Sequence, residues 1–327
     1  WINRMVCAVG SILWFGGPAL AVDQENVGPW HVEVPAGREL DTLANHYWSF
    51  TAVDGVGTQH VWAIGDQFLI RATHNGGTTW RTENPSATPV SGAGPQLADV
   101  SAVSPTVAWA SGNYGTVMRT TNGGDSWTKV QGNAVNGSSY TNWSSISALD
   151  GSNAWAIRAD KANGFWWDIS ATQKIVRTSD GGATWTNLVV GQLNISVGAT
   201  IRMVTPLVGY LLRFDTVPES LVLGQNPDTK TANVLKTTDG GLTWSSQLTL
   251  NVDVTIRRHK LDVVDQNTVF LVVNLPYYGV SLTAADVDEM RVCRTLDGGT
   301  TWSEQRLPWG HPFLQGAQCG IADVDFA

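Results

Sequence analysis

The chain has 327 residues, a formal net charge of −8 at pH 7, and 15% charged against 43% hydrophobic residues. This acidic balance argues against a nucleic-acid partner, because the phosphates would be repelled. Its simplest role is to keep the protein soluble. The composition agrees with an exported all-β protein.

The first 21 residues have the pattern of a signal peptide. Arg4 precedes an apolar run that ends in Ala19-Leu20-Ala21, a small-residue cleavage signal. The run is too short, and too broken by Gly and Pro, for a comfortable membrane span. We therefore expect residues 1–21 to be a signal peptide that is incomplete at its start, and the protein to be periplasmic or extracellular. Further on, Trp30–Val34 resembles a strand.

An eight-residue phrase that begins with Thr and ends with Trp occurs five times, every 47 to 59 residues. An Asn or Asp followed by two glycines predicts a tight hairpin, because Gly adopts positive φ and the Asx side chain accepts bonds from turn N–H groups. The Trp ring is expected to pack on the sheet. We assign structural roles to Asn75, Asn122, Asp180, Asp239, Asp297 and to Trp80, Trp127, Trp185, Trp244, Trp302.

Short strands surround each phrase. In the second copy they are predicted at Leu97–Val103, Thr106–Ala110, Thr116–Thr120 and Ser126–Val130. Four strands in a unit of about 50 residues are typical of a propeller blade. The repeats lie near residues 48–90, 97–135, 143–193, 199–250 and 259–307, with a partial one from 320. We predict an all-β propeller over residues 22–327, truncated at its C-terminus, with six or seven blades in the full-length protein.

The phrase resembles the Asp-box or BNR repeat, Ser/Thr-x-Asp-x-Gly-x-Thr-Trp, of sialidases and sortilin-type receptors. The pattern from Ala98-Asp99-Val100 to Trp127 is most similar to the photosystem II stability/assembly factor-like family. The likeness spans roughly Trp48 to Ala327. It implies a binding or assembly scaffold, which in a photosynthetic organism would lie in the thylakoid lumen.

The first strands of the repeats carry polar residues at one aligned position, including Asp99, Asp262 and Asp323. One interpretation is a polar ring that lines a central channel and holds water, an ion or a ligand group. The other is that these side chains join neighbouring blades by hydrogen bonds. The three carboxylates are also the candidates for glycoside hydrolysis by a pair of acids.

Loops between the second and third strands are long in three neighbouring repeats. Two of them carry aromatic pairs, Trp166-Trp167 and Tyr277-Tyr278. Such pairs suit a sugar ring, a peptide or a protein surface, or they pack their own loops onto the disc.

Basic residues precede four of the boxes: Arg119, Arg177, Lys236 and Arg294. The resemblance implies that arginines on one side of the disc contact a partner. The alternative from the residues themselves is that each basic stem lies over a Trp ring or pairs with the box Asp.

These features favour a scaffold that binds a protein partner in the periplasm or lumen or at a membrane surface. The alternative is a carbohydrate-active propeller, a sialidase-like glycosidase or a glycan-binding protein. The Phe/Tyr-Arg-Ile-Pro phrase of sialidases is missing from the sequence, and its histidines have no metal-ligand spacing. We predict no cofactor and no metal. Cys293 and Cys319 either form a disulfide or remain separate thiols.

Overall fold

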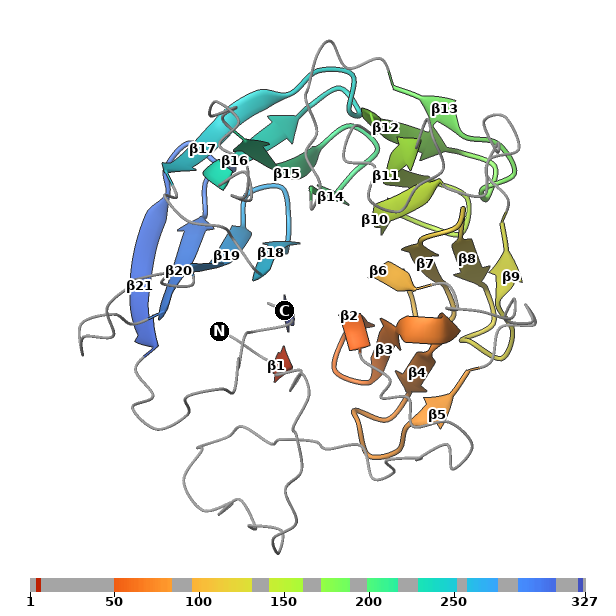
Figure 1. The fold of residues 1–327 in the computed structure, drawn as a ribbon. Helices are drawn as coiled ribbons and strands as arrows, with labels where there is room; N and C mark the ends of the chain where they lie inside the picture. Colours follow the sequence, from red (N-terminus) through yellow and green to blue (C-terminus); the bar gives the residue numbers. More distant parts are fainter. Residues whose placement is uncertain are drawn as a thin grey trace, which may run out of the picture.

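The computed structural model describes residues 4–6, 50–83, 96–130, 141–160, 172–188, 199–216, 229–251, 258–275, 288–309 and 323–325. Within these ranges the chain forms five four-stranded antiparallel sheets arranged around a central axis (Figure 1). The prediction of an all-β propeller with four-stranded blades is confirmed. No helix in the described part is long and apolar enough to cross a membrane.

Each blade runs outward from the axis in sequence order. The strands of blade 1 are β2 (Phe50–Val56), β3 (His60–Gly65), β4 (Ile70–Thr73) and β5 (Arg81–Thr82), with a 3-10 turn at Asp66–Phe68. Those of blade 2 are β6 (Leu97–Ala102), β7 (Ala108–Gly112), β8 (Val117–Thr120) and β9 (Thr128–Lys129). Those of blade 3 are β10 (Asn142–Ala148), β11 (Ala154–Asp160), β12 (Thr172–Thr178) and β13 (Thr186–Asn187).

Blades 4 and 5 have longer outer strands. Blade 4 consists of β14 (Thr200–Met203), β15 (Gly209–Thr216), β16 (Thr229–Thr237) and β17 (Ser245–Asn251). Blade 5 consists of β18 (Arg258–Val263), β19 (Val269–Leu275), β20 (Asp288–Thr295) and β21 (Ser303–Trp309).

Two short strands lie between blades 5 and 1. The strand β1 (Arg4–Val6) pairs antiparallel with β22 (Asp323–Asp325). β22 lies against both β18 and β2, the innermost strands of blades 5 and 1. It therefore occupies a sixth inner-strand position in the ring.

Each box forms a turn between the third and fourth strands of its blade. In blade 3, Asp180 Oδ1 accepts bonds from Thr184 N at 2.9 Å and Thr178 Oγ1 at 2.8 Å. The next two residues, Gly181 and Gly182, have φ of 75° and 89°, which L side chains rarely adopt. In blade 1 the same position is Asn75, whose Nδ2 donates to Thr79 Oγ1 at 2.8 Å. Asn can take the place of Asp in this turn because the Thr79 hydroxyl accepts a hydrogen bond from the amide, whereas the Thr184 hydroxyl of blade 3 donates one to the carboxylate.

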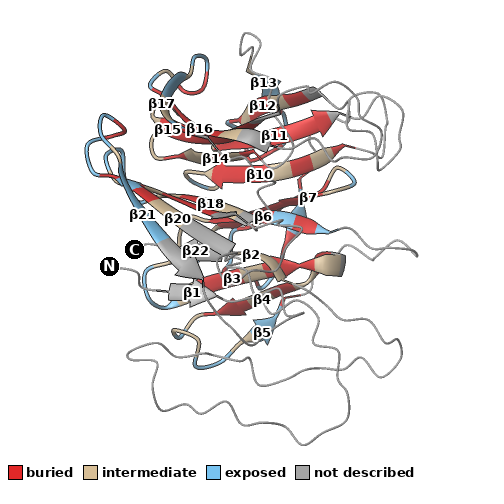
Figure 2. Ribbon diagram, turned by 60° about the vertical axis from the view of Figure 1, so that its left-hand side comes forward, coloured by how far each residue is buried: buried red, intermediate tan, exposed pale blue. Residues whose placement is uncertain are grey.

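The hydrophobic core lies between neighbouring blades. It includes the aromatic residues of the second strands, Trp62, Trp109, Trp155 and Tyr210, all 0% exposed. Figure 2 shows buried positions along strands such as β3 and β11. Burial of these rings makes each blade depend on the next for its stability.

Candidate functional site

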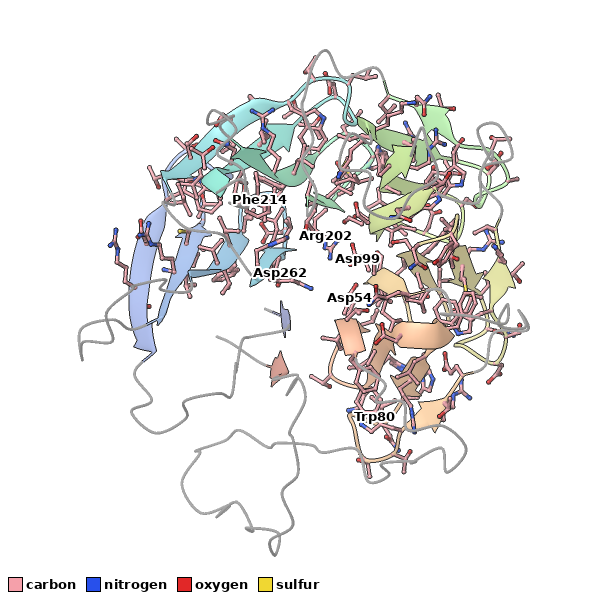
Figure 3. All side chains as sticks on the ribbon, in the orientation of Figure 1. Asp54, Trp80, Asp99, Arg202, Phe214 and Asp262 are labelled. Atoms are coloured by element: carbon pink, nitrogen blue, oxygen red, sulfur yellow. The ribbon has the colours of Figure 1, made fainter. Side chains whose placement is uncertain are left out.

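A network of ion pairs and hydrogen bonds lies beside the central axis. Arg202 on β14 reaches across blade 3 to Asp99 on β6, with Nη1–Oδ2 at 2.8 Å and Nη2–Oδ1 at 3.0 Å (Figure 3). Ser145 Oγ, on the strand between them, donates to Asp99 Oδ2 at 2.7 Å. Three blades are thus joined through one carboxylate.

The network fixes the charge of Asp99. Burial raises the pKa of this carboxyl, but the charge and hydrogen bonds of Arg202, with help from Lys260 and Ser145, outweigh burial and hold the pKa below its usual value. Its carboxylate also accepts the backbone N–H groups of Val100 and Ile146. Asp99 is therefore a structural anion.

Other polar side chains on the inner strands join neighbouring blades in the same way. Ser101 Oγ accepts Ala148 N at 3.0 Å, and Ser147 Oγ accepts Met203 N at 2.8 Å. Asp54 Oδ2 accepts Ala102 N at 2.8 Å. These bonds favour the interpretation that the polar inner-strand positions tie the blades together.

The other two candidate carboxylates lie on the inner strands β18 and β22. Asp262 lies on β18 opposite Phe270, is half-buried, and is labelled on the inner side of the ring of blades in Figure 3. Asp323 lies on β22 opposite Val6, and its side chain falls outside the described part of the structure.

The basic residues that precede the boxes pack on aromatic rings. Arg119 lies 5.4 Å from the centroid of Trp109, Arg177 lies 4.6 Å from that of Trp155, and Lys236 Nζ lies 5.3 Å from that of Tyr210. Each cation stands directly opposite its ring across strands two and three. This is the geometry of a cation–π pair.

These aromatic–cation pairs also hold the next blade. Trp155 Nε1 donates to Gly240 O at 2.9 Å, and Tyr210 Oη donates to Gln266 O at 2.9 Å. Lys236 Nζ donates to Gly298 O at 2.8 Å. We call this arrangement, a stacked aromatic and cation bonded to turn carbonyls of the following blade, the blade lock. Its members are Trp109/Arg119, Trp155/Arg177 and Tyr210/Lys236.

The lock is altered in the first and fifth blades. In blade 1, Trp62 stands opposite Ala72, so the cation is missing, and Arg71 stands opposite Ala63 instead. In blade 5, Arg294 stands opposite Phe270 but is exposed. Of the four basic candidates, Arg294 is thus the one with its side chain in solvent.

The box residues are partly exposed turn residues. Hydrogen bonds from the box threonines lower the pKa of Asp180, Asp239 and Asp297 to about 2. Trp127 and Trp185 are buried, whereas Trp80, Trp244 and Trp302 are half-buried. A cavity of about 300 Å³ lies at the first box, lined by Ala72, His74, Asn75, Thr79, Trp80 and Arg81.

Exposed aliphatic side chains lie in turns on the box face of blades 4 and 5, and we call this set the aliphatic patch. Four large side chains there are between 45% and 59% exposed: Leu207, Leu242, Val264 and Leu296. Each lies in a box or in the turn between the first two strands, and these turns share one face of the disc. Sequence reasoning missed this patch. The sequence did contain an indication of it, because Leu242 and Leu296 occupy box positions that hold the smaller residues Ala183 and Ser179 in blade 3.

Several predicted residues cannot be placed. Trp166, Trp167, Tyr277 and Tyr278 lie outside the described residues. Cys293 is buried, and burial raises the pKa of its thiol to about 11, with a contribution from Glu304. Cys319 lies outside the described residues, so its pairing stays a prediction.

Comparison with known proteins supports the architecture. No protein-family model and no curated protein sequence matches the chain. A structure of a protein of unknown function from Dyadobacter fermentans is 11% identical to this chain. The alignment covers 81% of this chain and 84% of that protein, with a TM-score of 0.51.

Two further structures align less closely. YCF48 bound to a D1 peptide is 16% identical over 78% of this chain and 82% of its own, with a TM-score of 0.47. The GH74 enzyme of Niastella koreensis is 15% identical over 79% of this chain and 38% of its own, with a TM-score of 0.48. At such identities, similarity extends to the fold alone. The chain is a β-propeller with four-stranded blades.

Proposed function

We propose that this protein is an exported propeller that acts by binding, as an assembly scaffold for an extracytoplasmic or membrane protein complex. The observation that carries the proposal is the aliphatic patch of Leu207, Leu242, Val264 and Leu296. Exposed aliphatic groups on one face suit a protein contact, because their burial against a partner is favourable.

Charges at the edge of the patch suit a protein partner. The carboxylates of Asp239 and Asp297, with pKa values lowered to about 2, stay ionised at neutral pH. Hydrogen bonds from the backbone N–H groups of Asn267 and Thr268 also lower the pKa of Asp265. An apolar centre with an acidic rim favours a partner segment that offers apolar side chains flanked by Lys or Arg.

Asp99 does not suit the acid role of a glycosidase. A glycosidase needs one carboxylic acid whose pKa is raised so that it can give up a proton. Asp99 has the opposite property, because Arg202 and Ser145 hold it as an anion. The aromatic pairs Trp166-Trp167 and Tyr277-Tyr278 remain a proposed second contact on the opposite face.

The proposal is tested by affinity capture with the full chain after crosslinking in a membrane and periplasmic extract. The test variant combines Leu242→Asp and Leu296→Asp, two exposed changes that leave the core intact. The matched control combines Ala183→Asp and Ser179→Asp at the same box positions of blade 3, which are also exposed. A Trp166→Ala/Trp167→Ala variant examines the loop face.

We expect one specific polypeptide to be captured by the wild type and the control and to be lost with the blade 4 and 5 variant. Equal capture by all variants would contradict a role for the patch. Recovery of the bait alone, together with glycan binding that Asp262→Asn abolishes, would favour the carbohydrate-active alternative.

A further inference from the structure

A tight turn joins β7 to β8 of blade 2, at the opposite end of these strands from the box turns. Tyr114 and Gly115 have φ of 53° and 66°, and Thr116 N donates to Asn113 O at 3.1 Å. Positive φ at both central residues is typical of a type I′ turn, in which Asn, Asp and Gly are the usual residues. A bulky residue rarely adopts this conformation, because its Cβ crowds the backbone. The turn therefore stores strain at Tyr114.

Hydrogen bonds hold this turn in place. Gly115 N donates at 2.6 Å to the carbonyl oxygen of Thr141, which precedes the first strand of blade 3. Asn113 and Gln96 bond in both directions, because Asn113 N donates to Gln96 O at 3.0 Å and Gln96 N donates to Asn113 Oδ1 at 2.7 Å. The Tyr114 side chain is thus presented from a fixed backbone.

Blade 1 provides an internal comparison. Within the described residues, the other non-glycine residue with positive φ is Phe68, at 61°, in the corresponding loop between β3 and β4. Phe68 is 8% exposed and packs in the core between blades 1 and 2, so burial of its ring offsets the strain. Tyr114 is 43% exposed. Burial therefore explains Phe68 but not Tyr114, and strain that burial does not offset indicates a function.

The charge near the turn indicates the chemistry of a partner. Gln96, which holds Asn113, also donates from Nε2 to Asp66 Oδ1 of blade 1 at 2.7 Å. A carboxylate therefore lies on the same face of the neighbouring blade, in a chain whose net charge is −8. An exposed aromatic ring near a carboxylate suits the guanidinium of Arg or the ammonium of Lys, which stacks on the ring face. An acidic segment would be repelled.

We propose that Tyr114 is a binding residue for a basic segment of a protein partner, with an Arg or Lys side chain over its ring. The protein nature of this partner rests on the proposed function, whereas the surface is a separate one, on the opposite face from the aliphatic patch. Tyr is common at the centres of protein contacts. A ring on a rigid turn also loses little conformational entropy when a partner binds.

The variant Tyr114→Gly separates binding from folding. Glycine adopts positive φ without strain, so this variant should melt at the wild-type temperature or above it. The matched control is Phe68→Gly, which also lies at positive φ but removes a buried ring, and it should melt lower. Calorimetry of the full chain measures both. A melting temperature for Tyr114→Gly below that of the wild type would show that its ring supports the fold, and would overturn the proposal.

Binding is measured with a phage library of random peptides, panned on the immobilised full chain and counter-selected on Tyr114→Gly. We expect the enriched peptides to carry Arg or Lys. One of them, made synthetically and titrated by calorimetry, should bind the Tyr114→Gly chain at least about tenfold more weakly than the wild type. Tyr114→Phe keeps the ring and should bind like the wild type.

The variant with Leu242→Asp and Leu296→Asp distinguishes the two faces. It should bind the selected peptide like the wild type, even if the aliphatic patch proves to contact no partner. Loss of peptide binding in this variant would assign the contact to the patch and overturn the role of Tyr114. Equal affinity for the wild type and Tyr114→Gly, or no enrichment of basic peptides, would also overturn it. Glycan binding that Tyr114→Gly abolishes, without peptide binding, would replace the protein partner with a carbohydrate.

Discussion

The junctions that follow blades 2 to 4 differ from the junction between blades 1 and 2. In the former, an aromatic ring with its stacked cation donates to neutral backbone carbonyls, as Trp155 does to Gly240. In the latter, the buried carboxylate of Glu83 accepts Trp127 Nε1 at 2.8 Å and Arg81 Nε at 3.2 Å. The regular junctions therefore rely on neutral backbone acceptors, whereas the first relies on a buried carboxyl group that also faces Arg81.

The largest expected effect comes from removing a regular lock. Trp155→Ala deletes a ring that is 0% exposed and leaves a cavity between blades 3 and 4. We expect the free energy of unfolding to fall by about 3–5 kcal/mol. Urea unfolding followed by circular dichroism measures it. Trp80→Ala, at a half-buried box position, is the control and should cost clearly less. Equal losses would refute the special role of the lock.

Breaking the central ion pair comes next. Asp99→Asn leaves Arg202 partly buried without its anion, and we expect a loss of about 3 kcal/mol. Asp125→Asn removes the exposed partner of Arg81, whose Nη1 lies 2.8 Å from Asp125 Oδ1, and should cost under about 1 kcal/mol. Chemical denaturation of both variants distinguishes a buried pair from an exposed one. A cost for Asp99→Asn as small as that for Asp125→Asn would contradict the structural role of the network.

Glu83→Gln examines the first junction. The amide oxygen can still accept Trp127 Nε1, but the charge that faces Arg81 and His74 is lost. We expect a loss of about 1–2 kcal/mol in the free energy of unfolding. A loss as small as that for Asp125→Asn would contradict a structural role for Glu83 at this junction.

A smaller difference in stability is expected between variants of two basic residues, Arg177 and Arg294. Arg177→Met removes the charge over the Trp155 ring and should cost about 1 kcal/mol. Arg294→Met changes an exposed side chain and should stay within about 0.5 kcal/mol. Thermal unfolding of the two variants side by side decides this. A reversed order would mean that Arg294 has a structural role that the lock cation Arg177 lacks.

The smallest effect concerns pH and the box turns. The folded-state pKa of Asp180 and Asp239 is about 2, below the ordinary value of 3.8. Their contribution is therefore complete above about pH 4 and is lost as pH falls toward 2. Asp180→Asn with Asp239→Asn should flatten the fall in melting temperature over that window. The boxes of blades 1 and 2, which carry Asn75 and Asn122, do not titrate. An unchanged slope would assign the acid sensitivity to other carboxyls.

The repeated phrase was sufficient to predict the propeller, because its turn chemistry and strand spacing are local properties. The fate of the basic residues was not predictable, because Arg177 and Arg294 have the same place in the phrase. What separates them is tertiary packing, because Arg177 lies over the Trp155 ring whereas Arg294 is exposed. The first junction was hidden for the same reason: His74 and Glu83 are brought together by strand pairing and the turn. Leu242 and Leu296 were readable as apolar residues, but their exposure depends on the face on which each turn lies.

The central claim is that the box face of blades 4 and 5 contacts a protein partner, and site-specific photocrosslinking tests it most directly. A photoreactive amino acid replaces Leu242 in one sample and Ala183, at the equivalent position of blade 3, in the other. We predict that irradiation in the native extract links position 242 to one discrete polypeptide and leaves position 183 unlinked. Identical crosslinks at both positions, or none at 242, would contradict the account.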